Sequence, residues 1–175
     1  RRAGATVWRV GFNAGDRAFW FDRDSYLPFQ RTPEQWPETF AEICAEKQVT
    51  DIVLYGDTRP IHAQAVAHAK ELGLRIHVFE EGYLRPFWVT YERNGSNGHS
   101  RLMDLSVPEM REALERSDMD SNLPPSHWGD MRHHVFYGAL YHWFVMFRNQ
   151  DYKLFRRHRD LPVSREFYLY FNRLL

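Results

Sequence analysis

The sequence predicts an α/β fold in which helices are layered on a Rossmann-like parallel sheet, followed by a helical, aromatic-rich segment. Three short apolar runs, 7–12, 51–55 and 74–79, have the length and composition of buried strands. Two helical patterns, 32–48 and 60–72, separate them, with short links between. Strands that alternate with helices in this way are typical of a parallel sheet, because a parallel crossover needs an intervening helix.

Cap residues mark the ends of the two helices. Thr32 is the expected N-cap of the first, with Pro33 at its first position, and Gly73 closes the second. Cys44 falls on the apolar side of the first helix, so we expect a buried thiol. It is the only cysteine, which rules out a disulfide within the chain and favours a reducing compartment.

The pattern changes beyond residue 85. We expect an extended run at 88–92 and a helix at 107–116 that is capped by Ser106. An aromatic helix at 127–147 and a basic stretch at 152–159 follow. We therefore divide the chain into a layered domain, 1–104, and a mostly helical extension, 105–175.

Composition and motifs exclude several classes of function. The 175 residues carry 23 basic and 23 acidic side chains, and a net charge of zero does not suggest a nucleic-acid partner. The nine histidines show no metal-binding spacing such as HExxH, so no metal is expected. The absence of GxSxG, GxxxxGK[ST] and GxGxxG motifs argues against hydrolase, P-loop and dinucleotide-binding functions.

The aromatic helix is too short to span a membrane. Its uncharged core, 135–147, has 13 residues, whereas a spanning helix needs roughly 20. Five Lys or Arg residues follow between 148 and 159, and apolar surface beside cations suits an anionic lipid surface. Burial of the helix against the domain is the simpler interpretation. Because the chain starts without Met and ends abruptly, we expect it to be part of a longer protein.

A polar cluster follows each of the three predicted strands, at 13–16, 56–59 and 80–82. The carboxyl ends of parallel strands meet at one edge of a sheet, where ligands bind in such folds. The three clusters should therefore meet in space. Asn13 and Asp16 are expected to contact a substrate there.

Two adjacent acids, Glu80 and Glu81, leave the third strand ahead of Gly82. Adjacent like charges favour protonation of one, and one acid can face the cleft while the other packs or pairs. A positioned carboxylate can take a proton from an acceptor hydroxyl or attack an anomeric carbon. Arg85 could hold a carboxylate or phosphate of the substrate. A solvated turn with a local ion pair is the alternative.

Asp57, Arg59 and His62 follow the second strand, where Pro60 begins a helix whose N-terminus favours anions. Asp57 is expected either to bind substrate or to cap this helix. Arg59 and His62 are candidate substrate-binding residues because they lie near the other clusters, although His62 could instead be an ordinary surface residue of the helix.

Three strings in this order, 12–16 (FNAGD), 55–62 (YGDTRPIH) and 79–86 (FEEGYLRP), resemble the capsule polysaccharide biosynthesis and export family, in its capsular polysaccharide export protein branch. The resemblance implies the N-terminal half of a GT-B glycosyltransferase that transfers Kdo, an eight-carbon acid sugar, from CMP-Kdo to a phosphatidylglycerol-type lipid. It implies no cofactor beyond this donor, and a cytoplasmic protein peripheral on the inner membrane. By similarity to a motif of bacterial sialyltransferases, Glu81 is the catalytic base or nucleophile. The second catalytic residue is its neighbour Glu80, which is expected to tune Glu81 rather than to react.

Two departures from the family pattern matter. A strand and a Gly-rich turn that would precede Arg1 are absent, and the sequence has no His-Pro pair to bind the CMP phosphate. We therefore expect the nucleotide-binding half to lie outside this chain and the fragment alone to be inactive. Two alternatives remain, a non-catalytic adaptor that passes capsule glycolipid to the export machinery and a sugar-nucleotide epimerase-like enzyme.

Overall fold

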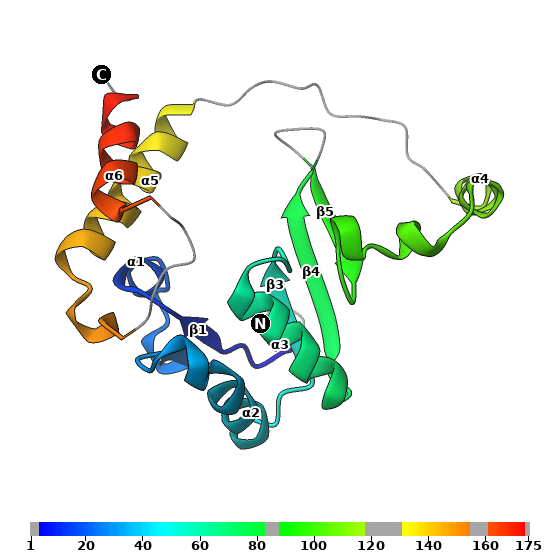
Figure 1. Cartoon of the computed structure of the whole chain (residues 1–175), viewed down its shortest axis with the longest axis horizontal. Coiled ribbons are helices and arrows are strands. Elements are labelled where there is room, and N and C mark those ends of the chain that lie inside the picture. Colours follow the sequence, from blue (N-terminus) through cyan, green and yellow to red (C-terminus); the bar gives the residue numbers. More distant parts are fainter. Residues whose placement is uncertain (1–3, 83–87, 118–130, 155–160, 174–175) are drawn as a thin grey trace. The chain divides into compact units, whose positions relative to one another are not determined.

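The computed structural model describes residues 4–82, 88–117, 131–154 and 161–173. The chain folds into two compact units, one built from 1–36 with 130–175 and the other from 37–129 (Figure 1). The division of the chain at residue 104 that the sequence suggests stays a prediction.

A three-stranded sheet forms the centre of the second unit. β3 (Asp51–Tyr55) and β4 (Arg75–Glu81) run parallel and are connected by α3 (Pro60–Glu71). β5 (Val89–Arg93) pairs antiparallel with β4, which therefore lies in the middle. The predicted strand, helix and strand between residues 51 and 79 are confirmed, and an antiparallel edge strand is added to them.

The helix α3 covers one face of this sheet (Figure 1). Pro60 can begin it because the first helical residue needs no backbone N–H partner. Ala65 and Ala69 lie one turn apart on α3 and are buried, as are Ile76 and Val78 of β4. Small side chains on the helix let it approach the strands closely, and this contact forms the core of the unit.

Within the described part of the second unit, further elements precede and follow the sheet in the sequence. They are α2 (Trp36–Glu46), two 3-10 turns, η3 (Asn97–His99) and η4 (Arg101–Asp104), and α4 (Val107–Glu115). A capping box between Ser106 and Glu109 starts α4 as the sequence predicts. Cys44 is 7% exposed, which confirms the predicted buried thiol, and this burial raises the pKa of the thiol.

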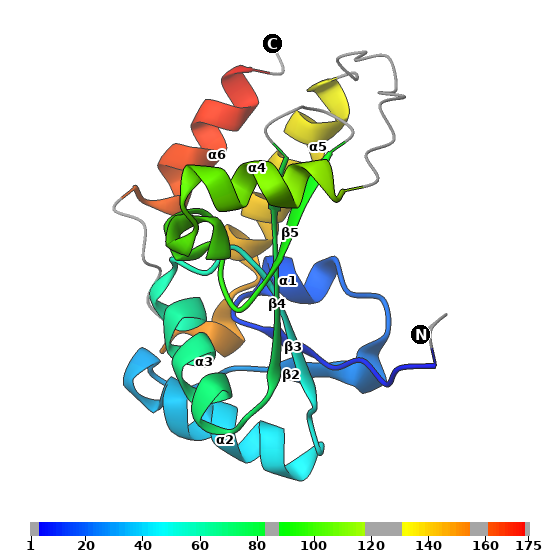
Figure 2. The same cartoon turned by 90° about the vertical axis from the view of Figure 1, so that its right-hand side faces the viewer.

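The first unit combines a two-stranded sheet with a pair of helices. β1 (Arg9–Gly11) pairs in parallel with β2 (Tyr26–Pro28), and α1 (Ala14–Ala18) follows β1. α5 (Met131–Phe147) and α6 (Val163–Asn172) run side by side (Figure 2), and α1 packs against α5. Among its described residues this unit also has three 3-10 turns, η1 (Arg23–Ser25), η2 (Pro33–Gln35) and η5 (Gln150–Tyr152).

Aromatic residues fill the interior of the first unit. The rings of Phe12, Phe29 and Trp36 pack together with centroids 5.0 to 5.5 Å apart. The hydroxyl groups of Tyr26 and Tyr152 lie 2.9 Å from each other, and burial raises the pKa of both. Both phenols therefore stay protonated at neutral pH, and one donates to the other.

Two expectations need correction. The sequence predicts a single parallel sheet that contains 7–12, but β1 pairs with β2 in a sheet of its own. Apolar periodicity shows that a segment is a strand and does not show which strand it pairs with. β4 also continues two residues beyond its predicted end at Phe79, because pairing with β5 extends it through Glu81.

Candidate functional site

The candidate site lies at the carboxyl ends of β3 and β4. Glu80 and Glu81 are the last residues of β4 and pair with Thr90 and Val89 of β5. The loop that begins at Gly56 leaves the end of β3. Because β3 and β4 are parallel, these two polar clusters lie at the same edge of the sheet, where ligands bind in α/β folds.

Glu80 and Glu81 belong to opposite faces of the sheet, since side chains alternate along a strand. Glu80 shares its face with Ile76 and Val78, which are 1% and 0% exposed on the side of α3. Glu81 shares the other face with Phe79 and is exposed. Only Glu80 therefore belongs to the side of the sheet that α3 covers.

Gly56 brings the loop after β3 against Glu80. Its φ of 77° lies in the left-handed region that favours glycine, and its amide donates to the carbonyl of Phe79 at 2.8 Å. A Cβ at this position would lie 3.1 Å from Oε1 of Glu80. His62 Nδ1 lies 2.7 Å from the Gly56 carbonyl oxygen, so Nδ1 carries the hydrogen because a carbonyl only accepts.

Asp57 is a buried anchor for a neighbouring segment. It is 3% exposed, and its Oδ2 accepts from the amide of Ser96 at 2.9 Å and from Nδ1 of His99 at 3.1 Å. Oδ1 is buried and has no hydrogen-bond partner among the described residues. The N-cap of α3 is Arg59, with no side-chain cap bond, so the alternative that Asp57 caps this helix is wrong.

The two cations expected at the site are Arg59 and Arg85. Arg59 is exposed at the start of α3, on the same edge of the sheet as the acids. Arg85 lies outside the described residues. A role in substrate binding stays a prediction for both.

Asn13 and Asp16 lie in the first unit, at the start of α1. The Asn13 side chain accepts from the Asp16 amide at 2.9 Å, and Asp16 accepts from the Phe12 amide at 2.9 Å. The hydroxyl of Tyr141 on α5 accepts a hydrogen bond from the Asn13 side chain at 2.7 Å and donates one to the Asp16 carboxylate at 3.2 Å. These side chains thus cap α1 and hold it to α5, and their predicted contact with substrate stays a prediction.

Three residues of these networks carry no sequence signal for their roles. Tyr141 is one of nine tyrosines and lies within an aromatic helix, where nothing distinguishes it from its neighbours. Ser96 and His99 flank an Asn-Gly turn, which indicates a loop and does not indicate that the loop reaches Asp57. Their separations from Asp57 are 39 and 42 positions.

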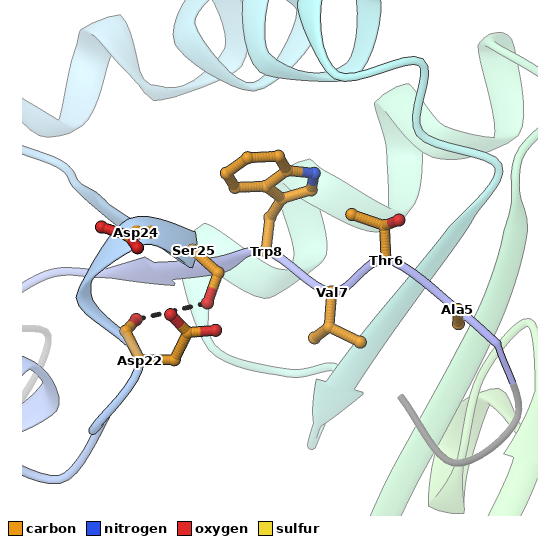
Figure 3. A pocket seen from close by; sticks show the side chains of 7 residues that line it. All are labelled: Ala5, Thr6, Val7, Trp8, Asp22, Asp24 and Ser25. Atoms are coloured by element: carbon orange, nitrogen blue, oxygen red, sulfur yellow. Dashed lines mark hydrogen bonds between the residues drawn. The ribbon is translucent and has the colours of Figure 1, made fainter.

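A pocket of about 390 Å³ lies in the first unit (Figure 3). It is lined by residues 5–8 together with Asp22, Asp24 and Ser25. The side chains of Val7 and Trp8 leave the chain on opposite sides (Figure 3), and the Ser25 hydroxyl donates to the carbonyl of Asp22 at 3.2 Å. None of the predicted site residues lines this pocket, so it is not the candidate site.

Neither a metal-ion site nor a membrane-spanning helix is found among the described residues. No group of three His, Cys, Asp or Glu side chains in these ranges could hold a metal ion. Among the same residues, no helix combines the length and the apolar character that crossing a bilayer requires, and α5 is 17 residues long.

Two curated proteins resemble part of this chain. Capsule polysaccharide export protein KpsS of Escherichia coli is 38% identical over 99 residues, which are 57% of this chain and 25% of that protein. Capsule polysaccharide modification protein LipB of Neisseria meningitidis serogroup A is 36% identical over 100 residues, which are 57% of this chain and 24% of that protein. The match thus spans about a quarter of the length of these relatives. No solved structure matches the chain.

The family described as Capsule polysaccharide biosynthesis protein matches residues 50–168. This region is more than half of the chain, and it contains β3, α3 and β4 together with the acids at the end of β4. The chain therefore belongs to the capsule polysaccharide biosynthesis protein family.

Proposed function

We propose that the protein is a glycosyltransferase of capsule biosynthesis that transfers Kdo from CMP-Kdo to a phosphatidylglycerol-type lipid. The observation that carries the proposal is the pair of acids at the end of β4, beside the loop that leads from Gly56 into α3. Membership of the capsule family supports a role in making this polymer. The choice of donor and acceptor rests on the resemblance of the strings at 55–62 and 79–86.

Glu81 is the proposed reacting carboxylate. In an inverting reaction it takes the proton of the acceptor hydroxyl while that oxygen attacks the anomeric carbon of Kdo. The bond between the anomeric carbon and the phosphate oxygen breaks, and CMP leaves. In a retaining reaction Glu81 first attacks the anomeric carbon and displaces CMP. The acceptor oxygen then displaces Glu81 and loses its proton to solvent.

The other site residues would bind and orient the substrates. Arg59 and Arg85 are suited to bind the carboxylate of Kdo and phosphate groups, because a guanidinium group can form bidentate hydrogen bonds with such anions. We assign further polar contacts with the substrates to Asn13, Asp16, Asp57 and His62. The residues that bind CMP belong, in this proposal, to the rest of the full-length protein.

We also propose that the protein works at the cytoplasmic surface of the inner membrane, where the lipid acceptor lies. Phe136, Trp143 and Phe147 of α5 are 54%, 37% and 54% exposed, and their spacing of seven and four residues places them on one side of the helix. Arg148 and Lys153 follow them and are exposed. Exposed aromatic rings beside cations suit a shallow contact with anionic lipid.

The test is to offer CMP-Kdo and dioctanoyl phosphatidylglycerol to the full-length protein and to measure the lipid by mass spectrometry. The expected product is heavier by one Kdo residue. Glu81→Gln protein, checked for folding by circular dichroism, should form little of it. Wild-type protein that forms no Kdo-lipid with these substrates would contradict the proposal.

A second candidate is an adaptor that binds capsule glycolipid and passes it to the export machinery. The observation in its favour is that one relative is named an export protein. An adaptor needs no reacting carboxylate, so cells that carry Glu81→Gln would still export capsule at a normal level. Loss of capsule with a folded Glu81→Gln protein favours the transferase.

A further inference from the structure

The imidazole ring of His99 is exposed, and a buried carboxylate holds it in place. Its Nδ1 lies 3.1 Å from Oδ2 of Asp57, and the two side chains are 65% and 3% exposed. The Ser96 amide donates to the same oxygen at 2.9 Å, so the segment that carries His99 is fixed at two points. A carboxylate oxygen accepts, so Nδ1 carries the hydrogen and the lone pair of the ring lies on Nε2. Nε2 forms no hydrogen bond or ion pair with the residues that the structure describes.

Asp57 lies at the same level of the sheet as Glu81. Tyr55, the last residue of β3, pairs with Phe79 of β4, and Asp57 and Glu81 each follow that pair by two residues. The first amide of the loop after β3 donates to a carbonyl of β4, so the loop stays against β4 at this edge. His99, which follows β5 in the sequence, is thereby held at the edge that carries Glu81.

The two side chains have the arrangement of a general base and the group that orients it. A buried carboxylate that accepts from one ring nitrogen fixes the tautomer of an imidazole. It also stabilises the imidazolium that forms when the other nitrogen takes a proton. His68 and Glu71 form a pair of the same kind at 3.0 Å near the other end of α3, but the Glu71 side chain is 71% exposed. Water competes for an exposed carboxylate, so that pair is held less firmly.

We propose that His99 is the general base that activates the acceptor, an inference that rests on the proposed transferase function. It concerns the retaining reaction, in which Glu81 is bonded to the anomeric carbon and is not available as the base. Nε2 of His99 takes the proton of the acceptor hydroxyl while that oxygen attacks the anomeric carbon. The bond to Glu81 breaks, Glu81 leaves as a carboxylate, and the imidazolium releases its proton to solvent. Asp57 is the positioning residue of this step and contributes to the site through His99.

The experiment measures turnover and the covalent intermediate in full-length protein supplied with CMP-Kdo and dioctanoyl phosphatidylglycerol. His99→Asn keeps an N–H donor near Asp57 and removes Nε2. Formation of Kdo-lipid should fall roughly 10²-fold or more, and protein that carries one covalently bound Kdo should accumulate and be detected by intact mass spectrometry. His68→Asn is the matched control, and it should keep its turnover and accumulate no such adduct.

Added imidazole separates a chemical role of His99 from a structural one. In His99→Ala the position is open to solvent, so imidazole can reach Asp57 and should restore part of the turnover. Asp57→Asn should slow the His99→Asn protein little further, because Asp57 acts through His99.

Three results would overturn the inference while wild-type Kdo transfer leaves the proposed function standing. They are near-normal turnover in folded His99→Asn protein, slow turnover without the adduct, and no rescue of His99→Ala by imidazole. The last result decides the question if His99→Asn does not fold. Wild-type protein that forms no Kdo-lipid would remove the proposed function and this inference together.

Discussion

The Asn13 side chain donates to the hydroxyl of Tyr141 at 2.7 Å, across 128 positions of sequence. The same hydroxyl donates to Asp16 at 3.2 Å, so one tyrosine of α5 serves both residues that begin α1. Gly15 lies between them, and a Cβ there would lie 2.5 Å from the Tyr141 ring. Polar contacts therefore hold together two segments of the first unit that are far apart in the sequence, where α1 packs closely against α5.

Tyr141→Phe tests the importance of this contact. The variant keeps the ring and removes the hydroxyl, which leaves Asn13 and Asp16 each without one partner. Two lost hydrogen bonds should lower the free energy of unfolding by about 1–3 kcal/mol, measured by urea denaturation. Tyr137→Phe is the control, because Tyr137 lies on the same helix and is 53% exposed. Equal effects of the two variants would show that the hydroxyl of Tyr141 contributes nothing specific.

The stability of the second unit should depend on pH through the carboxyl group of Asp51. Arg75 donates to it from Nε and Nη2 at 2.6 Å each, and Thr50 and His77 donate as well, so the pKa of this carboxyl lies well below its usual range. A lowered folded-state pKa stabilises the protein above the usual carboxyl pKa of about 4, and this contribution is lost as the pH falls below it.

The measurement is the urea midpoint of wild type and Asp51→Asn between pH 7 and pH 3. Asp51→Asn should be the less stable protein at pH 7, and the difference should shrink below about pH 4, where the carboxyl of the unfolded wild-type chain takes up a proton. A difference that stays constant down to pH 3 would count against this account.

Glu81→Gln keeps the volume of the side chain and removes the charge needed in a base or a nucleophile. Turnover of CMP-Kdo by the full-length protein should fall roughly 10²-fold or more, with unchanged thermal unfolding. Glu71→Gln, at the end of α3 and exposed, serves as an acid-to-amide control and should keep its activity. Near-normal turnover in folded Glu81→Gln protein would remove Glu81 from the chemistry.

Membrane binding through α5 should depend on charge. Each cation near an anionic surface contributes about 1 kcal/mol, so Arg148→Ala with Lys153→Ala should weaken binding to phosphatidylserine vesicles by about 10- to 30-fold. Phosphatidylserine is chosen because it is not the proposed acceptor. Arg101→Ala with Arg111→Ala, two exposed cations of the second unit, is the control. Protein that stays on vesicles in high salt would contradict a peripheral contact.

Local signals explain which parts of the fold are predictable. Pro60 and Gly73 bracket α3 in the sequence, and in the structure Pro60 is its first residue while Gly73 has a left-handed φ of 67°. β2, by contrast, has three residues and ends at Pro28, which is too short for a periodic pattern. The partner of β1 could therefore not be predicted, and neither could its separation from the sheet of β3 and β4.

The candidate site, like the fold, could be predicted from the sequence only in part. That Glu80 and Glu81 share a sheet edge with the loop at Gly56 follows from a parallel strand pair, which the sequence indicates. Which acid faces that loop depends on where β4 ends, and pairing with β5 extends the strand so that it includes both acids. Asp57 reaches Ser96 through chain folding that no local pattern encodes.

The first unit is discontinuous, since residues 37–129 separate its two segments. During synthesis, β1, α1 and β2 leave the ribosome before the 93 residues of the second unit, and Tyr141 comes later still. At roughly 5–20 residues per second the early segment waits about 5–20 s for α5. The second unit is continuous and can fold within that interval. Until the later segment arrives, Gly15 of α1 and Tyr26 of β2 lack their contacts with Tyr141 and Tyr152, so this part of the nascent chain is the one that a chaperone would most readily bind.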